Sequence, residues 1–337
     1  MAFKPASSCY CPNSTGRMKS ASATNSLAAH FVFHLDAHTE LSTRSFSRLQ
    51  GTTSDCTNVC LRSLFWVCYT IDKELCLRTR QPPALSDNHC DLTLSTDYLA
   101  RLLEDFAVSL PFGEFHPSIM FPVDIKLSQI KSQAYESLYS RAAFREGHTE
   151  LFERIRKLDE TLERWRMAVP QKYRPSLLFP LDTGIEVRNA DIRTLILRLD
   201  YLHCIAVIHQ ASNRGLRNPI NSHNTKATIA SSIALAVEAS RSSLRYLDKA
   251  HHILNKGSFW FVLFYPLAAS VTILCNMLDN PALPSTVHDY DLLKKVPRLM
   301  HNMSRHPLET EELLHKNQLE SFVQDLIRAA ECAIFGK

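Results

Sequence analysis

Residues 59–91 read VCLRSLFWVCYTIDKELCLRTRQPPALSDNHCD, and this stretch decides the fold class. Apolar residues recur in its first half at steps of three and four, which is the spacing of one face of an α-helix. The two consecutive prolines, Pro82 and Pro83, end this helix because proline cannot continue the hydrogen-bond ladder. The stripe predicted to be buried consists of Leu61, Leu64, Phe65, Cys68, Asp72 and Leu75.

Asp72 is the charged residue on this apolar stripe, so we expect its carboxylate to be at least partly buried. A buried charge requires hydrogen bonds or a partner of opposite charge. None of the residues three or four positions away on the helix is basic. We therefore hypothesise that an arginine, or backbone N–H groups of another element, meets Asp72, for example from the loop with Arg78 and Arg80. Its expected role is structural rather than catalytic.

The same helical spacing recurs along most of the chain. The clearest case is the segment 149–169, whose apolar residues keep strict steps of four and three. The chain has only 8 glycines and no run that alternates as a β-strand does. We predict an all-α fold, an irregular multi-helix bundle. Further helices are predicted near 97–110, 127–138, 189–210, 226–254 and 319–330.

The N-terminal segment 1–55 has a different composition, with 16 Ser or Thr residues and little apolar content. Such a segment buries too little surface to offset its ordering entropy, so we predict that it is mostly disordered, apart from a short helix near 30–41. The helical domain is predicted to span 56–337. The net charge of +4 gives no case for an obligate nucleic-acid-binding surface.

Residues with the chemistry of a metal or catalytic site are few. The ten cysteines include no C-x-x-C pair, so they are interpreted as buried or incidental thiols. His30, His34 and His38 would stack along one side of a helix, but no glutamate follows His30 as zinc hydrolases require. The Asp-Tyr-Asp run at 289–291 is interpreted as a solvated loop. We predict no catalytic residue, no metal site and no cofactor, and thus not an enzyme.

The segment 259–278 contains no charged residue and is long enough to cross a membrane. It also contains Tyr265, Pro266 and Asn276, and no similar segment accompanies it. We therefore predict that it is a central buried helix and that the protein has no membrane contact.

A second pattern lies over the first and carries a resemblance to a known family. Its residues are Arg62, Phe65, Trp66, Tyr69, Asp72, Pro82, Pro83, Asp87, Asp91 and, further on, Trp165. Their order and spacing resemble the regulatory middle region of the fungal zinc-cluster transcription factors, over about residues 56–280. Arg80-Gln81 stands where the family has Gly-Arg, and Ser95 stands where a proline is expected.

This resemblance implies a nuclear regulator of RNA polymerase II transcription, with secondary-metabolite gene clusters among the targets that the family regulates. In that family the zinc cluster reads DNA, and this chain carries no such cysteine motif. The resemblance therefore implies action through the helical domain, without specific DNA contact. The implied partners are proteins of the transcription machinery or a zinc-cluster protein, as a homo- or heterodimer. The motif residues are implied to be structural.

Two other interpretations stay open at this point. One is a small-molecule sensor or an all-helical enzyme, built around a pocket among the central helices. The other is a truncated remnant of a longer zinc-cluster regulator.

Overall fold

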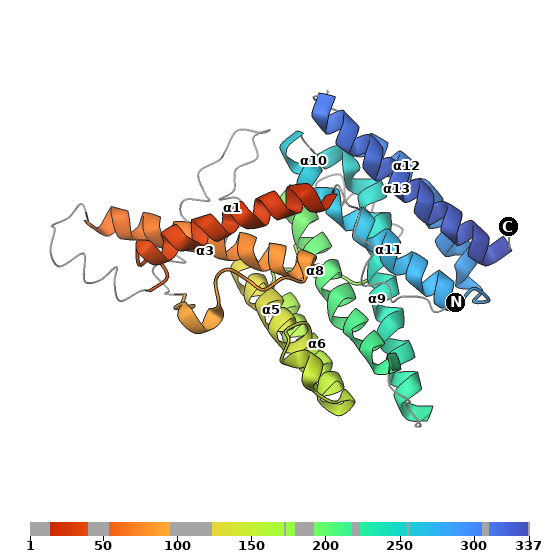
Figure 1. The fold of residues 1–337 in the computed structure, drawn as a ribbon, viewed down its shortest axis with the longest axis horizontal. Coiled ribbons are helices and arrows are strands. Elements are labelled where there is room, and N and C mark those ends of the chain that lie inside the picture. Colours follow the sequence, from red (N-terminus) through yellow and green to blue (C-terminus); the bar gives the residue numbers. More distant parts are fainter. Residues whose placement is uncertain are drawn as a thin grey trace. The chain divides into compact units, whose positions relative to one another are not determined.

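The computed structural model describes residues 14–39, 54–94, 123–171, 173–178, 192–217, 223–254, 256–304 and 310–335 (Figure 1). Every regular element in these ranges is an α-helix or a short 3₁₀-helix, which confirms the predicted all-α fold. The helix predicted near 97–110 lies outside the described residues.

The chain divides into two compact units. The N-terminal unit comprises Gly16–Gly147 and Glu160–Ala168, and the C-terminal unit comprises Met1–Thr15, His148–Asp159 and Val169–Lys337. Each unit is described separately below. The division predicted at residues 55 and 56 stays a prediction.

The N-terminal unit consists of helices packed around one apolar cluster. Its elements are α1 (Ser14–His34), α3 (Ser54–Thr79), η2 (Asp87–His89), α5 (Val123–Leu138), η4 (Ala143–Arg145) and the last turns of α6 (His148–Ala168). The cluster contains Phe65, Trp66 and Tyr69 of α3, each fully buried, together with residues of α1 and α5. These three large aromatic side chains form the centre of this core.

Helix α3 follows the sequence pattern, with one correction. It ends at Thr79, just before Arg80, which has a φ of 57°, and before the two prolines. Leu64 was predicted to be buried, but it is 43% exposed. The buried face is centred on Phe65 and Tyr69, and Leu64 points about 100° away from Phe65 around the helix axis.

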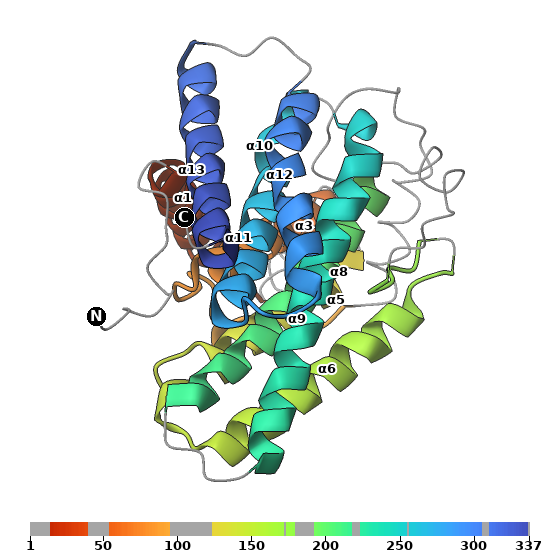
Figure 2. The same cartoon turned by 90° about the vertical axis from the view of Figure 1, so that its right-hand side faces the viewer.

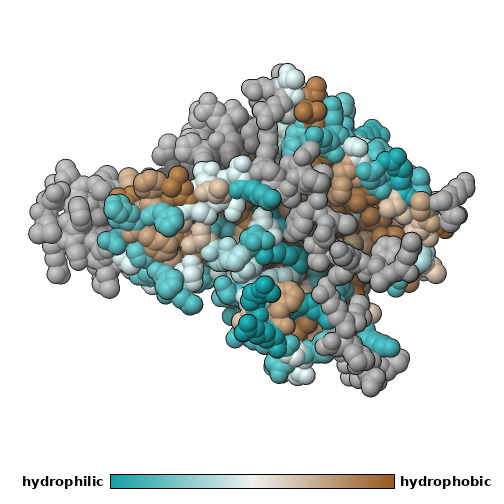
Figure 3. All heavy atoms as spheres, viewed as in Figure 1, coloured by the Kyte–Doolittle hydropathy of each residue, from teal (hydrophilic) through white to brown (hydrophobic). Residues whose placement is uncertain are grey.

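Helix α1 lies within the segment predicted to be mostly disordered. Its 21 residues form a helix, and Ala29 and Val32 pack into the core beside α3. The opposite side of the helix remains apolar and exposed, at Leu27 and Phe31. Figure 3 shows hydrophobic residues on the surface over α1 and α3. The short helix predicted near 30–41 overlaps α1 only at 30–34, because α1 ends at His34. Tertiary burial of one face orders a helix that begins earlier than composition predicted.

Two predicted stripes are confirmed as buried. The first stripe lies on α5 and consists of Leu127, Ile130, Ala134 and Leu138. The second stripe lies on α6 and the residue after it, and it consists of Leu151, Ile155, Leu158, Leu162, Trp165 and Val169.

The C-terminal unit is built on the pair α8 and α9, with α11 against α9. Its elements are the first turns of α6, α8 (Ile192–Gln210), η5 (Ala211–Arg217), α9 (His223–Ala250), η6 (His251–Ile253), α10 (Lys256–Val262), α11 (Phe264–Asp279), α12 (Ser285–Met303) and α13 (Thr310–Phe335). Helices α12 and α13 pack against each other and against α11 (Figure 2). Helix α8 is buried almost all round, which is typical of a central helix.

The uncharged segment forms α10 and α11. Within the described residues, 259–279 is the one helical stretch that is long and apolar enough to cross a membrane. Half of its most apolar part is buried inside the protein. The core helix of a soluble protein can have the same length and apolar composition as a membrane span. Tyr265, Ala269 and Ile273 form its buried side, against the neighbouring helices of the unit.

Helix α12 was not predicted, and the interpretation of 289–291 as a solvated loop is wrong. Asp289 lies inside this helix and is fully buried. A proline at position 297 also lies inside the helix and weakens the local helix signal. Packing of Leu292, Leu293 and Val296 against the unit stabilises the helix in spite of it.

The two neighbours Leu64 and Phe65 provide a test of the α3 register. Replacing Phe65 with alanine is expected to lower the free energy of unfolding by about 3–5 kcal/mol, because it leaves a cavity in the core. The same truncation at Leu64 is expected to cost about 0.5 kcal/mol or less. Urea unfolding followed by circular dichroism measures both. Equal losses at the two positions would contradict the register described here.

Candidate functional site

Asp72 carries a buried carboxylate in the N-terminal unit, and this residue is only 3% exposed. The backbone N–H of Ala84 donates to its Oδ1 at 2.8 Å, and that of Leu85 donates to its Oδ2 at 3.1 Å. The side-chain amide of Asn25, on α1, donates to Oδ1 at 3.0 Å. Three donors from two other segments thus satisfy a charge in the core.

Lys73 provides the positive charge of this centre and is fully buried. Its Nζ lies 3.4 Å from Oδ2 of Asp72 and 3.1 Å from Oδ1 of Asp87, and it also donates to the carbonyl oxygen of Leu85. The ammonium sits 4.8 Å from the centre of the Tyr69 ring. The Tyr69 hydroxyl donates to Asp87 Oδ1 at 3.0 Å.

The hypothesis that an arginine or backbone N–H groups of another element meet Asp72 is therefore confirmed through the second of these groups. Backbone N–H groups of another element do meet the carboxylate. The cation is Lys73 rather than an arginine of the following loop. Arg78 instead pairs with Glu74, one turn earlier on α3, and Lys131 of α5 pairs with the same glutamate.

Arg62 joins two segments by binding their carbonyl oxygens. Its Nη1 lies 3.4 Å from the oxygen of Ala37 and 3.3 Å from that of His38, after the end of α1. Its Nη2 donates to the carbonyl of Asp91 and lies 3.4 Å from that of Thr93. The guanidinium therefore holds the end of α1 beside the segment that follows η2.

The rings of Phe65 and Trp66 stabilise Arg62 from the apolar side. Their centroids lie 4.5 and 4.8 Å from its guanidinium carbon, within range of cation–π attraction. The aromatic pair therefore has two roles, since it fills the core and positions the arginine.

The remaining motif residues have simpler places. Pro82 is exposed and Pro83 is partly buried, and the loop they form brings Ala84 and Leu85 to Asp72. Trp165 is buried on α6, an element separate from α3 and its following loop.

Proton chemistry in this centre is suppressed by burial. Burial, and then Asp87, raises the pKa of the Tyr69 hydroxyl well above its usual range. Burial also raises the pKa of the Cys76 thiol, and it raises the pKa of Cys90 to about 11. At neutral pH these groups stay protonated and act as hydrogen-bond donors or as apolar filling, not as nucleophiles.

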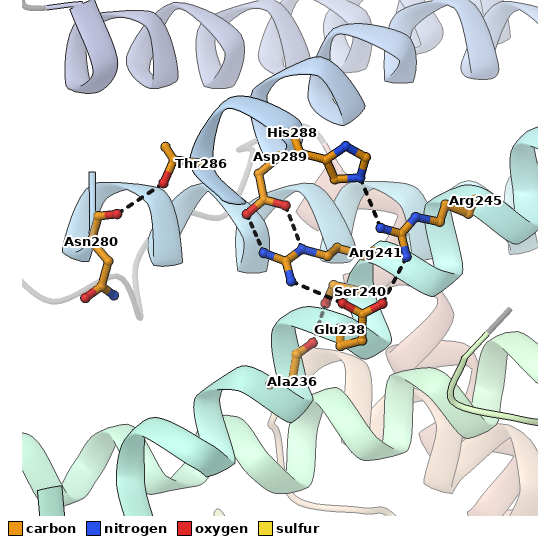
Figure 4. A network of polar contacts seen from close by, with 9 residues as sticks. All are labelled: Ala236, Glu238, Ser240, Arg241, Arg245, Asn280, Thr286, His288 and Asp289. Carbon is orange, nitrogen blue, oxygen red and sulfur yellow. Dashed lines mark hydrogen bonds and ion pairs between the residues drawn. The ribbon is translucent and has the colours of Figure 1, made fainter. Parts of the chain in front are cut away.

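A second buried ion pair lies in the C-terminal unit, between α9 and α12 (Figure 4). Arg241 donates from Nε and Nη2 to the two carboxylate oxygens of Asp289, at 2.6 and 2.7 Å. Glu238 accepts from Arg241 at 3.1 Å and from Arg245 at 2.9 Å, and Arg245 lies 3.1 Å from His288. The hydrogen bonds that Arg241 donates to Asp289 raise the pKa of its guanidinium further.

Sequence reasoning missed this pair, although a signal was present. Tyr290, Leu293, Val296 and Met300 recur at steps of three and four, which is helical spacing. In that register Asp289 lies on the inner side of the helix, beside Tyr290, as Asp72 does on α3.

One serine–histidine contact bears on the enzyme alternative. His209 Nδ1 lies 2.9 Å from Ser232 Oγ, and its Nε2 lies 3.5 Å from Asp159 Oδ1. A triad requires a serine nucleophile that a substrate can reach. Ser232 is 7% exposed, and its hydroxyl also lies 3.4 Å from the carbonyl oxygen of His209. The contact joins α8 to α9 inside the core.

The histidine arrangement considered for a metal is corrected by the structure. Helix α1 ends at His34, and Asp36 has a φ of 53°, so His38 does not continue the helical row of His30 and His34. Across the described residues, no group of three or more His, Cys, Asp or Glu side chains is placed to hold a metal ion.

The chain is similar to curated fungal proteins. It is 27% identical over 236 residues to an ABC-transporter-regulating transcription factor of Aspergillus oryzae, covering 65% of this chain and 25% of that protein. It is 26% identical over 251 residues to a protein of the same name in Aspergillus fumigatus, covering 70% of this chain and 26% of that protein. An uncharacterized transcriptional regulatory protein of Schizosaccharomyces pombe is 20% identical over 272 residues, or 80% of this chain and 34% of that protein.

These relatives are much longer than the region they share with this chain. The chain spans about a quarter of the length of the two Aspergillus proteins and about a third of the Schizosaccharomyces pombe protein. No protein-family model matches the chain. No solved structure matches it.

The buried Lys73 provides the sharpest test of the Asp72 centre. Replacing it with methionine keeps a side chain of similar bulk but leaves Asp72 and Asp87 without their ammonium partner. We expect the free energy of unfolding to fall by about 3–5 kcal/mol, as when one partner of a buried pair is removed. Chemical denaturation measures the change.

The matched control is Lys126→Met on α5, where the lysine is exposed. Its effect is expected to be within about 0.5 kcal/mol. If the two methionine variants unfold at the same denaturant concentration, Lys73 does not hold the centre together.

Proposed function

We propose that this chain is the helical regulatory part of a fungal transcription regulator, acting on genes transcribed by RNA polymerase II in the nucleus. The similarity to three fungal proteins named as transcription factors or regulators, over 65–80% of this chain, carries the proposal. The arrangement of the N-terminal unit supports it, because its charged motif residues serve packing: Asp72 and Arg62 join helices and loops.

The proposed mode of action is through protein contacts and not through DNA recognition by this chain. The sequence contains no C-x-x-C pair, and the net charge is only +4. The partners we propose are proteins of the transcription machinery or a zinc-cluster protein, with a homo- or heterodimer as the assembly. We also propose that the chain is not an enzyme.

The targets are proposed from the names of the relatives. Two of them are named as regulators of ABC transporters, which favours transporter genes as targets. Regulation of a secondary-metabolite cluster stays a prediction from the resemblance.

A tethering experiment tests the function directly. The full chain fused to an unrelated DNA-binding module is expected to change transcription of a reporter that carries the matching sites. The module alone provides the baseline, and a fusion with Phe65→Ala, which loses the core, is expected to return to it. A folded fusion that leaves reporter mRNA at the baseline would rule out a regulatory role for this chain.

DNA binding by the purified chain is the second test. We expect only weak binding to duplex DNA, without sequence preference and lost by about 200 mM salt, because the net charge of the chain is only +4. Gel-shift titrations of promoter and random duplexes measure it. Nanomolar binding that depends on sequence and survives this salt concentration would show that the chain reads DNA itself.

A further inference from the structure

Helix α12 presents a solvent-facing row of side chains opposite its buried residues. We call this row the α12 face, and its members are Val287, Asp291, Lys294, Lys295, Arg298 and His301, all exposed. Apart from Lys295, they follow one another at steps of four, three, four and three. This spacing places them along one side of the helix, as a second helix laid beside it would require.

The α12 face carries an excess of positive charge. Asp291 is its single acid and lies 2.8 Å from Lys294, so these two charges compensate each other. Within the ranges that the structure describes, no carboxylate lies at ion-pair distance from Lys295 or Arg298. Asp291 also attracts Lys295 at longer range, so the face has three cations, Lys294, Lys295 and Arg298, and one carboxylate.

The α12 face begins at the apolar Val287, and two exposed leucines precede it, Leu278 at the end of α11 and Leu283 in the turn before α12. Val287 is 58% exposed, and Leu278 and Leu283 are each 45% exposed. The turn is ordered, since the N–H of Leu283 donates to the carbonyl of Asn280 at 3.3 Å. Large apolar side chains thus stay exposed at three positions within 278–287, and such exposure is typical of interaction surfaces.

The fold holds α12 in place beneath this face. Leu292, Leu293 and Val296 are buried, and the bidentate pair of Asp289 with Arg241 ties the helix to α9 (Figure 4). The exposed side chains are therefore presented by a rigid element, which lowers the cost of binding.

We propose that the α12 face, with the apolar turn residues before it, is the docking surface for an acidic amphipathic protein segment. Carboxylates of the segment meet Lys295 and Arg298, and its apolar side chains cover Leu283 and Val287. Charge complementarity selects an acidic partner. The apolar end selects protein over nucleic acid, and the three cations of the face are fewer than phosphate-backbone binders use. The inference rests on the proposed function, because it names the surface for those protein partners.

The test uses the purified full chain and a fluorescent peptide of about 16 residues that has Leu or Phe at helical steps of three and four and Asp or Glu at its other positions. Fluorescence anisotropy is expected to show saturable binding that weakens as salt is raised. The double variant Lys295→Glu, Arg298→Glu is expected to bind about tenfold more weakly, because repulsion replaces attraction. The variant Leu283→Ser, Val287→Ser is expected to bind several-fold more weakly, since it removes apolar contact.

A matched control reverses two charges elsewhere on the C-terminal unit. Lys226→Glu combined with Arg328→Glu changes the net charge equally at exposed positions of α9 and α13, and it is expected to leave the Kd unchanged. Circular dichroism checks that every variant keeps its helices.

Several results would overturn the proposal. The first is a lack of saturable peptide binding by the unmodified chain, and the second is a control variant that weakens binding as much as the Lys295 and Arg298 reversal. The third is a peptide with serine at its apolar positions that binds as tightly as the original peptide. The fourth is a DNA duplex of about 20 base pairs that binds the same residues more tightly than the peptide. The peptide assay is independent of the reporter. A chain that binds the peptide but leaves the reporter unchanged keeps the docking surface and loses the proposed function. If the Lys295→Glu, Arg298→Glu variant keeps both the reporter response and the peptide binding, the docking surface is wrong and the proposed function stands.

Discussion

The carboxylate of Asp72 lies inside an apolar core, and the N-terminal unit is organised around compensating its charge. An uncompensated carboxylate there would cost several kcal/mol, so its partners are as necessary as the aromatic side chains around it. Those partners come from three places: Asn25 on α1, Lys73 on α3, and the backbone of Ala84 and Leu85 after the prolines. Each hydrogen bond therefore also fixes one segment against α3. This explains how a helix in a segment of low apolar content becomes part of the core.

The C-terminal unit uses the same device once more. Asp289 is fully buried on α12, and Arg241 of α9 meets both of its oxygens. The pair joins two helices that are separated in the chain by α10 and α11. In both units buried charges serve to orient helices, which suits a protein whose proposed role is to present surfaces to partners. A rigid α12 is what makes its exposed row of side chains a defined surface rather than a set of scattered charges.

The spacing of apolar residues along the sequence predicted the helices that have a continuous apolar face. The row of the segment 149–169 is buried as its spacing indicated, and α3 ends where its prolines require. The pattern failed where a helix depends on its neighbours. Helix α1 is short of apolar residues and looks weak in isolation. Helix α12 has a clear apolar spacing, but its internal proline interrupts the signal. Leu64 was wrongly predicted to be buried, because spacing does not decide whether an apolar residue at the edge of a stripe faces the core or the solvent.

The sequence by itself determined the helical class, the end of α3 before Pro82 and Pro83, and the burial of Asp72, because periodicity and proline geometry are local properties. Only the tertiary structure decided which groups compensate that carboxylate. Its donors stand 12 to 47 positions away in the chain, and packing alone brings them within 3.1 Å. The burial of Lys73 could not be predicted from the sequence either. A lysine beside an apolar stripe normally extends its ammonium to solvent, and here Asp72 and Asp87 hold it inside.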